Sequence, residues 1–307
     1  MILKFILEAF LLAVAFDLAF GEPHPLFHPT VWIGTLIGFL DTHAPKSFQR
    51  AYGVLMALFC IGLFAIAGYA VPYLLYQLSP TVALLVTAYL LKSTFSLSFL
   101  WRISGDIHRD LKEGKLEAAR AKLPALVGRD VSKLNGGQMA SCVIESLGES
   151  FVDGIFSPLF YFILFGLPGA MAYRAINTLD SMVGYKDAKH IKVGWASARI
   201  DDVANFIPAR LAVLLMAIIS GHPSRSLKTS WRDGGNAPSI NSGYPMAAFA
   251  GGLGIRLEKL DYYVLGEGLK PCAPDDIPRA IAFNRLLSAA LVIIIMAVMW
   301  FTILPLL

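Results

Sequence analysis

The feature that most constrains the fold is a long run without a charged side chain, from Ala51 to Leu91. An apolar helix needs about 20 residues to cross a bilayer, and this run is long enough for two. Pro72, Ser79 and Pro80 lie within it, and the last two mark a tight turn. The run therefore predicts two membrane helices joined by a hairpin.

Two more segments are predicted to cross the membrane. Leu286 to Leu307 is uncharged and rich in Ile, Leu, Val and Met. Met1 to Phe20 begins like a signal peptide, but Glu8 interrupts its apolar run and no small-residue cleavage site follows. We expect it to be retained as a membrane helix. Short or glycine-rich apolar segments at 30–40, 206–221 and 246–257 leave the number of additional crossings open.

The apolar segment from Gly154 to Tyr173 makes a poor straight span, because Pro158 and Pro168 interrupt it. Broken and re-entrant helices are tolerated at membrane depth where protein buries them. Of the 307 residues, 56% are hydrophobic and 16% charged, against about 25% charged in soluble domains. We therefore predict an all-α fold: one polytopic integral membrane domain over residues 1–307, with re-entrant or broken helices.

Basic residues cluster after Trp101, so the positive-inside rule puts this loop in the cytoplasm and the turn at Gln77–Pro80 on the opposite face. Within the loop we expect one amphipathic helix from Gly105 to Leu123 and a second from about Asn135 to Val152. Residues 102–150 would form a cytoplasmic helical insertion.

Charge and cysteine usage exclude several classes of function. The net charge of +4 is too small to indicate nucleic-acid binding. Cys60, Cys142 and Cys272 are widely spaced without a CxxC pair, which argues against disulfides and zinc. We expect each to be a small buried hydrophobe.

Polar residues beside apolar segments are functional candidates, because a polar group inside a membrane is costly. Glu145, Glu149 and Asp153 are spaced four residues apart, which forms one acidic stripe on a helix. Like charges at that spacing repel, so a metal ion or a basic partner is expected, and carboxylate oxygens suit Mg2+. A solvated acidic face is the alternative, although the stripe runs directly into an apolar segment.

The other candidates are carboxylates, amides, arginines and a few further polar groups in similar positions: Asp17, Glu22, His28, Arg129, Asp130, Asn177, Asp180, Ser181, Lys186, Arg199, Asp201, Asp202, Asn205, Arg210 and Asn241. A solvated helix-ending turn explains the first three equally well. A surface ion pair is the simpler explanation for Arg129 with Asp130, and ordinary turn chemistry explains Asn241. Mononucleotide, dinucleotide, hydrolase and zinc-protease motifs are absent. The chemistry suits either Mg2+-phosphate handling or an ion pathway.

Five segments carry a resemblance to a known family. Residues 16–23 read FDLAFGEP, 126–130 read LVGRD, 145–154 read ESLGESFVDG, 177–185 read NTLDSMVGY and 198–202 read ARIDD. They resemble the adenosylcobinamide-phosphate synthase family (CobD/CbiB type) of cobalamin biosynthesis, and the likeness covers most of the chain.

The resemblance implies an ATP-dependent amide ligase that uses Mg2+ and lies in the cell (cytoplasmic) membrane. Such an enzyme joins the propionate carboxylate of adenosylcobyric acid, a corrinoid, to aminopropanol phosphate, ethanolamine phosphate or the free aminoalcohol. The implied phosphate binders are Arg129, Arg199 and Arg210. The implied metal ligands or bases are Glu145, Glu149, Asp153, Asp201 and Asp202, with Asp180 as a further catalytic candidate. A second copy of the chain and other cobalamin-assembly enzymes stay open as partners.

Three departures from the family pattern bear on function. Ser150 stands where an Asn is expected, Met246 replaces a Glu, and residues 239–243 read SINSG instead of SPNAG. A non-catalytic membrane sensor of the AmpE type is therefore one rival. A transporter that uses the acids as an ion path is another, although the repeats that such a protein would show are not found.

Overall fold

The computed structural model describes residues 2–260 and 262–303, and the predicted C-terminal span extends past them to 304–307. The described chain is nearly all helical and divides into two units. The first unit holds residues up to Ser96, Ser157 to Asn205, and the chain from Ile293 onward. The second holds Leu97–Phe156 and Phe206–Val292.

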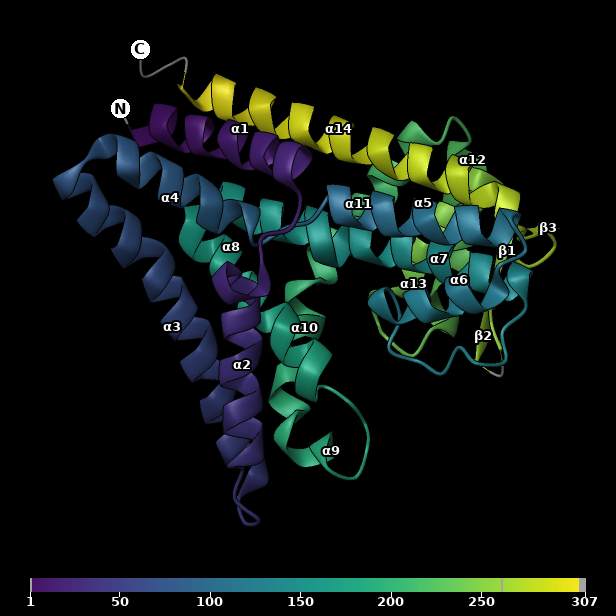
Figure 1. The fold of residues 1–307 in the computed structure, drawn as a ribbon, viewed down its shortest axis with the longest axis horizontal. Coiled ribbons are helices and arrows are strands. Elements are labelled where there is room, and N and C mark those ends of the chain that lie inside the picture. Colours follow the sequence, from purple (N-terminus) through teal and green to yellow (C-terminus); the bar gives the residue numbers. More distant parts are fainter. Residues whose placement is uncertain (1, 261, 304–307) are drawn as a thin grey trace. The chain divides into compact units, whose positions relative to one another are not determined.

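The first unit is built from seven α-helices, one short 3-10 helix and the end of α14. They are α1 (Ile2–Phe20), η1 (Pro25–Phe27), α2 (Pro29–Thr42), α3 (Gln49–Leu78), α4 (Pro80–Lys92), α8 (Ser157–Val183), α9 (His190–Val193) and α10 (Trp195–Ala204). Helices α3 and α4 meet at the turn predicted at Ser79, and α1 packs along α4 (Figure 1). Ser79 caps α4 through its side chain, and Pro80 begins the helix.

A hydrophobic core in the first unit joins α2, α3, α8 and α9. Ile33, Met56, Cys60 and Leu179 are among its fully enclosed side chains. The backbones of α3 and α9 approach closely at Gly53, where the lack of a side chain leaves room. A Cβ at this position would lie 1.9 Å from the Val193 carbonyl oxygen. All three cysteines are free thiols, and Cys60 and Cys142 are buried as predicted. The prediction is wrong for Cys272, which is only half-buried.

The second unit contains the remaining elements. They are α5 (Ser98–Lys112), α6 (Leu116–Lys122), η2 (Leu123–Ala125), α7 (Gly136–Phe151), the π-helical turn η3 (Val152–Phe156), α11 (Phe206–Ile219), α12 (Pro223–Asp233), η4 (Gly234–Asn236), α13 (Gly243–Leu253), β1 (Ile255–Lys259), β2 (Tyr263–Leu265), β3 (Lys270–Pro271), η5 (Pro274–Asp276) and most of α14 (Ile277–Ile303). The predicted insertion, residues 102–150, falls wholly within this unit.

A small sheet in the second unit departs from the all-α prediction. Its strand order is β2-β1-β3. Leu257 of β1 lies opposite Leu265 of the antiparallel β2, while Ile255 lies opposite Lys270 of the parallel β3. Strand β1 packs against α7 and α13, so the sheet covers the helix that carries Glu145.

The expected helix from Gly105 to Leu123 is wrong in one respect, because the segment forms two helices. Gly114 adopts φ +73° between α5 and α6, a conformation that favours glycine and ends a helix. The second expected helix is confirmed as α7. Its capping box explains its start, since Asn135 Oδ1 accepts from the Gln138 amide at 3.0 Å and Gln138 Oε1 accepts from the Asn135 amide at 2.9 Å.

The predicted break in the segment from Gly154 to Tyr173 is present. The helix widens into a π-turn at Val152–Phe156, and Gly166 has non-helical angles (φ 66°, ψ −158°) two residues before Pro168. Backbone bonds freed by a proline inside a helix favour such a kink. The segment is therefore a broken helix and not one straight rod.

Three helical stretches in the described ranges are long and apolar enough to cross a membrane. They are α3, residues Gly136–Val183 and residues Pro274–Thr302. A fourth results if α10 and α11 together make one broken span. Helix α4 has 13 residues, fewer than the roughly 20 that a crossing needs, because it ends at Lys92. Helix α1 carries three charged residues, Lys4, Glu8 and Asp17, and is not among these stretches, so its predicted crossing is not confirmed.

Candidate functional site

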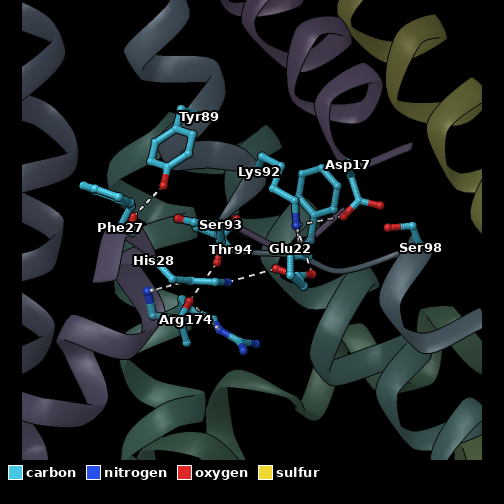
Figure 2. A network of polar contacts seen from close by, with 12 residues as sticks. Asp17, Glu22, Phe27, His28, Tyr89, Lys92, Ser93, Thr94, Ser98 and Arg174 are labelled. Carbon is cyan, nitrogen blue, oxygen red and sulfur yellow. Dashed lines mark hydrogen bonds and ion pairs between the residues drawn. The ribbon is translucent and has the colours of Figure 1, made fainter. Parts of the chain in front are cut away.

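A buried lysine, Lys92, lies at the centre of a charged network in the first unit. Its Nζ is 2.8 Å from Asp17 Oδ1 and 3.0 Å from Glu22 Oε1, while His28 Nε2 lies 2.9 Å from Glu22 Oε2. Figure 2 shows Lys92 reaching toward both carboxylates. The structure therefore joins the predicted Asp17, Glu22 and His28, and it excludes the alternative of solvated charges at a helix end.

Local structure explains why these groups meet. Asp17 lies in the last turn of α1, and Gly21 (φ 72°) turns the chain so that Glu22 follows closely. His28 caps α2, since its Nδ1 accepts from the Thr30 amide at 3.2 Å. Its other ring nitrogen is then directed at Glu22. Lys92 comes from the end of α4.

The electrostatics of this network favour a charged carboxylate. Burial alone would raise the pKa of Glu22, but the hydrogen bond with His28 and the positive charge of Lys92 outweigh it and lower that pKa to about 2. Asp17 and Lys92 are almost entirely enclosed. Glu22 is therefore a fixed negative charge at neutral pH.

Arg174 extends the network toward α8. The Thr30 hydroxyl donates to the Ser93 carbonyl oxygen at 2.7 Å and accepts from Arg174 Nε at 3.3 Å. Arg174 also donates to Asn177 Oδ1 at 3.3 Å, which links a predicted site residue of α8 to this region. Ser181 donates to the Asn177 carbonyl oxygen at 2.8 Å.

A second group in the first unit centres on Asn205. Its amide nitrogen donates to both carboxylate oxygens of Asp201 at 3.1 Å. Its Oδ1 accepts from the Ser157 hydroxyl at 2.7 Å and from the Tyr173 hydroxyl at 2.9 Å. The Ser157 and Tyr173 hydroxyls therefore hold the Asn205 amide, and that amide orients Asp201, as expected of a buried amide.

The remaining predicted residues of the first unit lie near this group or at the surface. Arg199 pairs with Asp202 at 2.9 Å and is exposed. Asp180 and Asp202 are close enough for their charges to interact. The Asp180 carboxylate also packs closely against Gly184, because a Cβ at that glycine would lie 2.1 Å from Asp180 Oδ1. Lys186 is exposed.

In the second unit the predicted Arg129 pairs with Glu145 and not with Asp130. Arg129 Nη2 is 2.9 Å from Glu145 Oε2 and 2.8 Å from Cys142 Sγ. The Arg129 Nε is buried and has no hydrogen-bond partner among the described residues. Asp130 instead accepts from the Ser132 amide at 2.9 Å. The expected surface ion pair is wrong, because Arg129 turns inward to a buried carboxylate.

The predicted acidic stripe covers the end of α7 and the turn after it. Glu145 is buried and Glu149 half-buried on α7, which excludes a fully solvated face. Asp153 is half-buried in the π-helical turn that follows α7. Such turns are frequent at functional sites.

The described residues contain no group of three His, Cys, Asp or Glu side chains placed to hold a metal ion. Side chains alone therefore do not form a metal site among them. Mg2+ is commonly held by one or two carboxylates together with substrate phosphates. The carboxylates of α7 are the right ligand type for that arrangement, and the unpartnered Arg129 Nε suits an anionic oxygen beside them. The Mg2+ site stays a prediction.

Tyr263 of β2 is a polar residue of this region that sequence reasoning missed. Burial and the carboxylates of Glu145 and Glu149 raise the pKa of Tyr263, so its hydroxyl stays protonated. That hydroxyl lies 3.9 Å from Met246 Sδ. The departure at Met246 therefore falls on a buried residue of α13 beside this tyrosine.

Arg210 and Asn241 form a third polar contact in the second unit. Arg210 donates to Asn241 Oδ1 and, at 3.1 Å, to the Ile240 carbonyl oxygen. Its guanidinium stacks over the rings of Phe206 and Tyr244. The loop at 239–243 is thus a turn that Arg210 fastens to α11.

Comparison with known proteins agrees with these motifs. The family model described as CobD/Cbib protein matches residues 10–302. The chain belongs to this family. It is 37% identical to the cobalamin biosynthesis protein CobD of Dehalococcoides mccartyi over 303 residues, which cover 96% of this chain and 98% of that protein. No solved structure matches the chain.

Two other relatives give the same result for the family. The chain is 39% identical to the probable cobalamin biosynthesis protein CobD of Methanothrix thermoacetophila, covering 93% of this chain and 96% of that protein. It is 38% identical to the cobalamin biosynthesis protein CbiB of Salmonella arizonae, covering 89% of this chain and 91% of that protein. The family predicted from the sequence motifs is confirmed.

Proposed function

We propose that this CobD/CbiB-family protein is a membrane-bound, ATP-dependent amide ligase of cobalamin biosynthesis. It would join the propionate carboxylate of adenosylcobyric acid to aminopropanol phosphate, ethanolamine phosphate or the free aminoalcohol. The names of the relatives support a role in cobalamin biosynthesis. Helices long and apolar enough to cross a membrane support a multi-pass location in the cell membrane.

One observation in the structure supports the chemistry most directly: Arg129 is held by the buried Glu145, and its Nε lacks a partner within the described chain. A guanidinium fixed at one end and unsatisfied at the other suits an anionic phosphate oxygen. Preorganised cationic donors of this kind are a large source of rate in phosphoryl transfer.

The proposed reaction has two steps. The corrinoid carboxylate oxygen attacks the γ-phosphorus of ATP and the bond to the leaving ADP breaks, which gives an acyl phosphate. The substrate amine, having lost a proton, then attacks the acyl carbon, and inorganic phosphate leaves as the C–N bond forms. Bound Mg2+ would neutralise phosphate charge. Arg129 would orient the phosphate, and Glu149 or Asp201 is a candidate acceptor for the amine proton.

The test is a product assay on purified protein in nanodiscs. Adenosylcobyric acid, ATP, Mg2+ and each amine in turn are supplied, and the corrinoid is analysed by mass spectrometry. We expect the mass gain of amide formation, and a loss of about 100-fold or more in turnover for Arg129→Met and for Glu149→Gln.

Glu117→Gln is the matched control, because Glu117 is 87% exposed on α6. It should retain wild-type turnover. Absence of product with every amine from well-folded wild-type protein would contradict the ligase proposal and favour a non-catalytic sensor. Full activity of both site variants would show that the chemistry lies elsewhere.

A further inference from the structure

A wide groove crosses the surface of the second unit beside α11 and α12. Its volume is about 1260 Å³, and its lining comes from α11, α12, the start of α13 and the chain after β2. Pockets for drug-sized ligands measure about 300–1000 Å³. A ligand that fills this groove is therefore larger than an aminoalcohol phosphate.

Apolar and aromatic side chains form part of the groove lining. Leu214 of α11 and Trp231 of α12 line it with 51% and 87% of their surface exposed, and Tyr244 lines it as well. Trp231 is the most exposed of the tryptophans that the structure shows as exposed on helices, and an exposed apolar surface of this kind marks a binding groove or a membrane contact. The groove thus presents a broad apolar platform.

Cationic groups surround this platform, but most of them have structural partners. Arg225 donates to the carbonyl oxygens of Gly251 and Gly252 at the end of α13. Arg232 pairs with Asp233 and donates to the Glu267 carbonyl oxygen, and Arg210 holds Asn241.

Lys228 differs from these arginines. It is exposed on α12 and lines the groove, and its ammonium group has no ion pair or hydrogen bond within the described ranges. Glu267 is the one acidic side chain among the lining residues. An occupant of the groove therefore meets an apolar platform with an available ammonium group at its edge.

We infer that this groove binds the corrinoid substrate. This inference rests on the proposed function and adds where the larger substrate is held. A corrinoid is a large, flat macrocycle with apolar faces and a rim of amide and carboxyl oxygens. One face covers Trp231 and Leu214, and Lys228 donates to rim oxygens. A long-chain lipid is the other amphiphile of suitable size, and the experiment separates the two.

The test measures binding without chemistry. Cobyric acid is titrated into the full-length protein in phosphatidylcholine nanodiscs, with no ATP and no amine, and the dissociation constant is taken from equilibrium dialysis. We expect Trp231→Ala and Lys228→Glu each to raise it about tenfold, which corresponds to about 1.4 kcal/mol. Trp231→Phe should restore most of the affinity, because it keeps an aromatic platform.

Two matched controls lie outside the groove. Trp300→Ala removes an exposed tryptophan of α14, and Lys192→Glu reverses an exposed lysine of α9. Both should bind cobyric acid within twofold of the wild type. Melting temperatures of all variants, measured in the same nanodiscs, identify any variant that fails to fold. If Trp231→Ala fails to fold, Lys228→Glu carries the comparison.

Unchanged binding by both Trp231→Ala and Lys228→Glu would overturn the inference. Quenching of Trp231 by brominated phosphatidylcholine would then assign the groove to acyl chains. The proposed function would survive that outcome if the wild type still forms the amide product and these variants keep its KM for adenosylcobyric acid. Failure of the ligase itself would appear as no product despite intact corrinoid binding.

Discussion

At the scale of single residues, Lys92 decides whether the buried Asp17 and the half-buried Glu22 are tolerated. It is 2% exposed and contacts Asp17 and Glu22 at 2.8 and 3.0 Å. Removing one partner of a buried ion pair leaves an uncompensated charge, which costs about 3–5 kcal/mol. We expect Lys92→Met to lower the free energy of unfolding by that amount, measured by thermal and denaturant unfolding in detergent.

The comparison needs an exposed lysine of the same unit. Lys4, exposed and 4.0 Å from Glu8, provides it, and Lys4→Met should change stability by less than about 0.5 kcal/mol. The double variant Lys92→Met with Asp17→Asn should be more stable than Lys92→Met alone, because it removes one of the two negative charges that Lys92 neutralises. A double variant that loses the sum of both single effects would refute this account.

Glu22 gives the same network a pH dependence. Its pKa is about 2 in the folded protein, against 4.5 for the unperturbed side chain. The folded state therefore binds fewer protons, and the stabilisation is present above about pH 4.5 and is lost as the pH falls toward 2. We expect Glu22→Gln to be less stable than the wild type by about 2–3 kcal/mol at pH 7.

That difference should shrink as the pH falls from 5 to 3. Melting temperatures of the wild type and Glu22→Gln, recorded in parallel across this interval, measure it. A constant gap between the two curves would mean that Glu22 keeps an ordinary pKa in the folded protein.

At the scale of elements, close backbone contact between α3 and α9 depends on one glycine. A Cβ at Gly53 would lie 1.9 Å from the Val193 carbonyl oxygen, whereas a Cβ at Gly62 of the same helix meets nothing within 4 Å. Gly53→Ala should cost about 1–3 kcal/mol through overpacking. Gly62→Ala should be neutral or stabilise by about 0.5–1 kcal/mol, because alanine favours the helix.

Unfolding of both variants in the same detergent checks this contrast. Equal stability of Gly53→Ala and Gly62→Ala would show that α9 moves away from α3 at little cost. The pair isolates packing from helix propensity, since both residues lie within α3.

Whether a helix or strand could be predicted depends on the kind of sequence signal that it carries. Uncharged length and turn residues predicted α3, α4 and their hairpin, and the caps of α7 follow from Asn135 and Gln138 alone. The sheet at 255–271 was missed because its strands are two to five residues long, too short for a period-two pattern to stand out. Gly114 was a visible break within one expected amphipathic helix.

The site residues divide in a similar way. Motif matches located Asp17, Glu22 and Arg129, but periodicity could not supply the partners that lie far away in the sequence. Lys92 was within reach of sequence reasoning, because it is the first charge after the uncharged run, and a lysine ending an apolar helix needs a counter-charge. The inward turn of Arg129 to Glu145 required the fold.

At the scale of the whole molecule, the sequence predicts which membrane face carries the chemistry. The basic residues after Trp101 predict that residues 102–150 lie in the cytoplasm and that the turn at Gln77 lies outside. In a Cys272→Ser background, Gln77→Cys should react with an impermeant maleimide in intact spheroplasts. Lys115→Cys should react only after lysis. Both positions are exposed, while Cys60 and Cys142 are buried.

The outcome bears directly on the ligase proposal. Residues 102–150 include Arg129, Glu145 and Glu149, and ATP is supplied on the cytoplasmic side. Labelling of Lys115→Cys in intact cells would place this segment outside, where a phosphate-binding Arg129 has no ATP to meet. Labelling only after lysis would leave the Arg129–Glu145 pair on the face where phosphoryl transfer can occur, and would make the variants at Arg129 and Glu149 the decisive ones to assay.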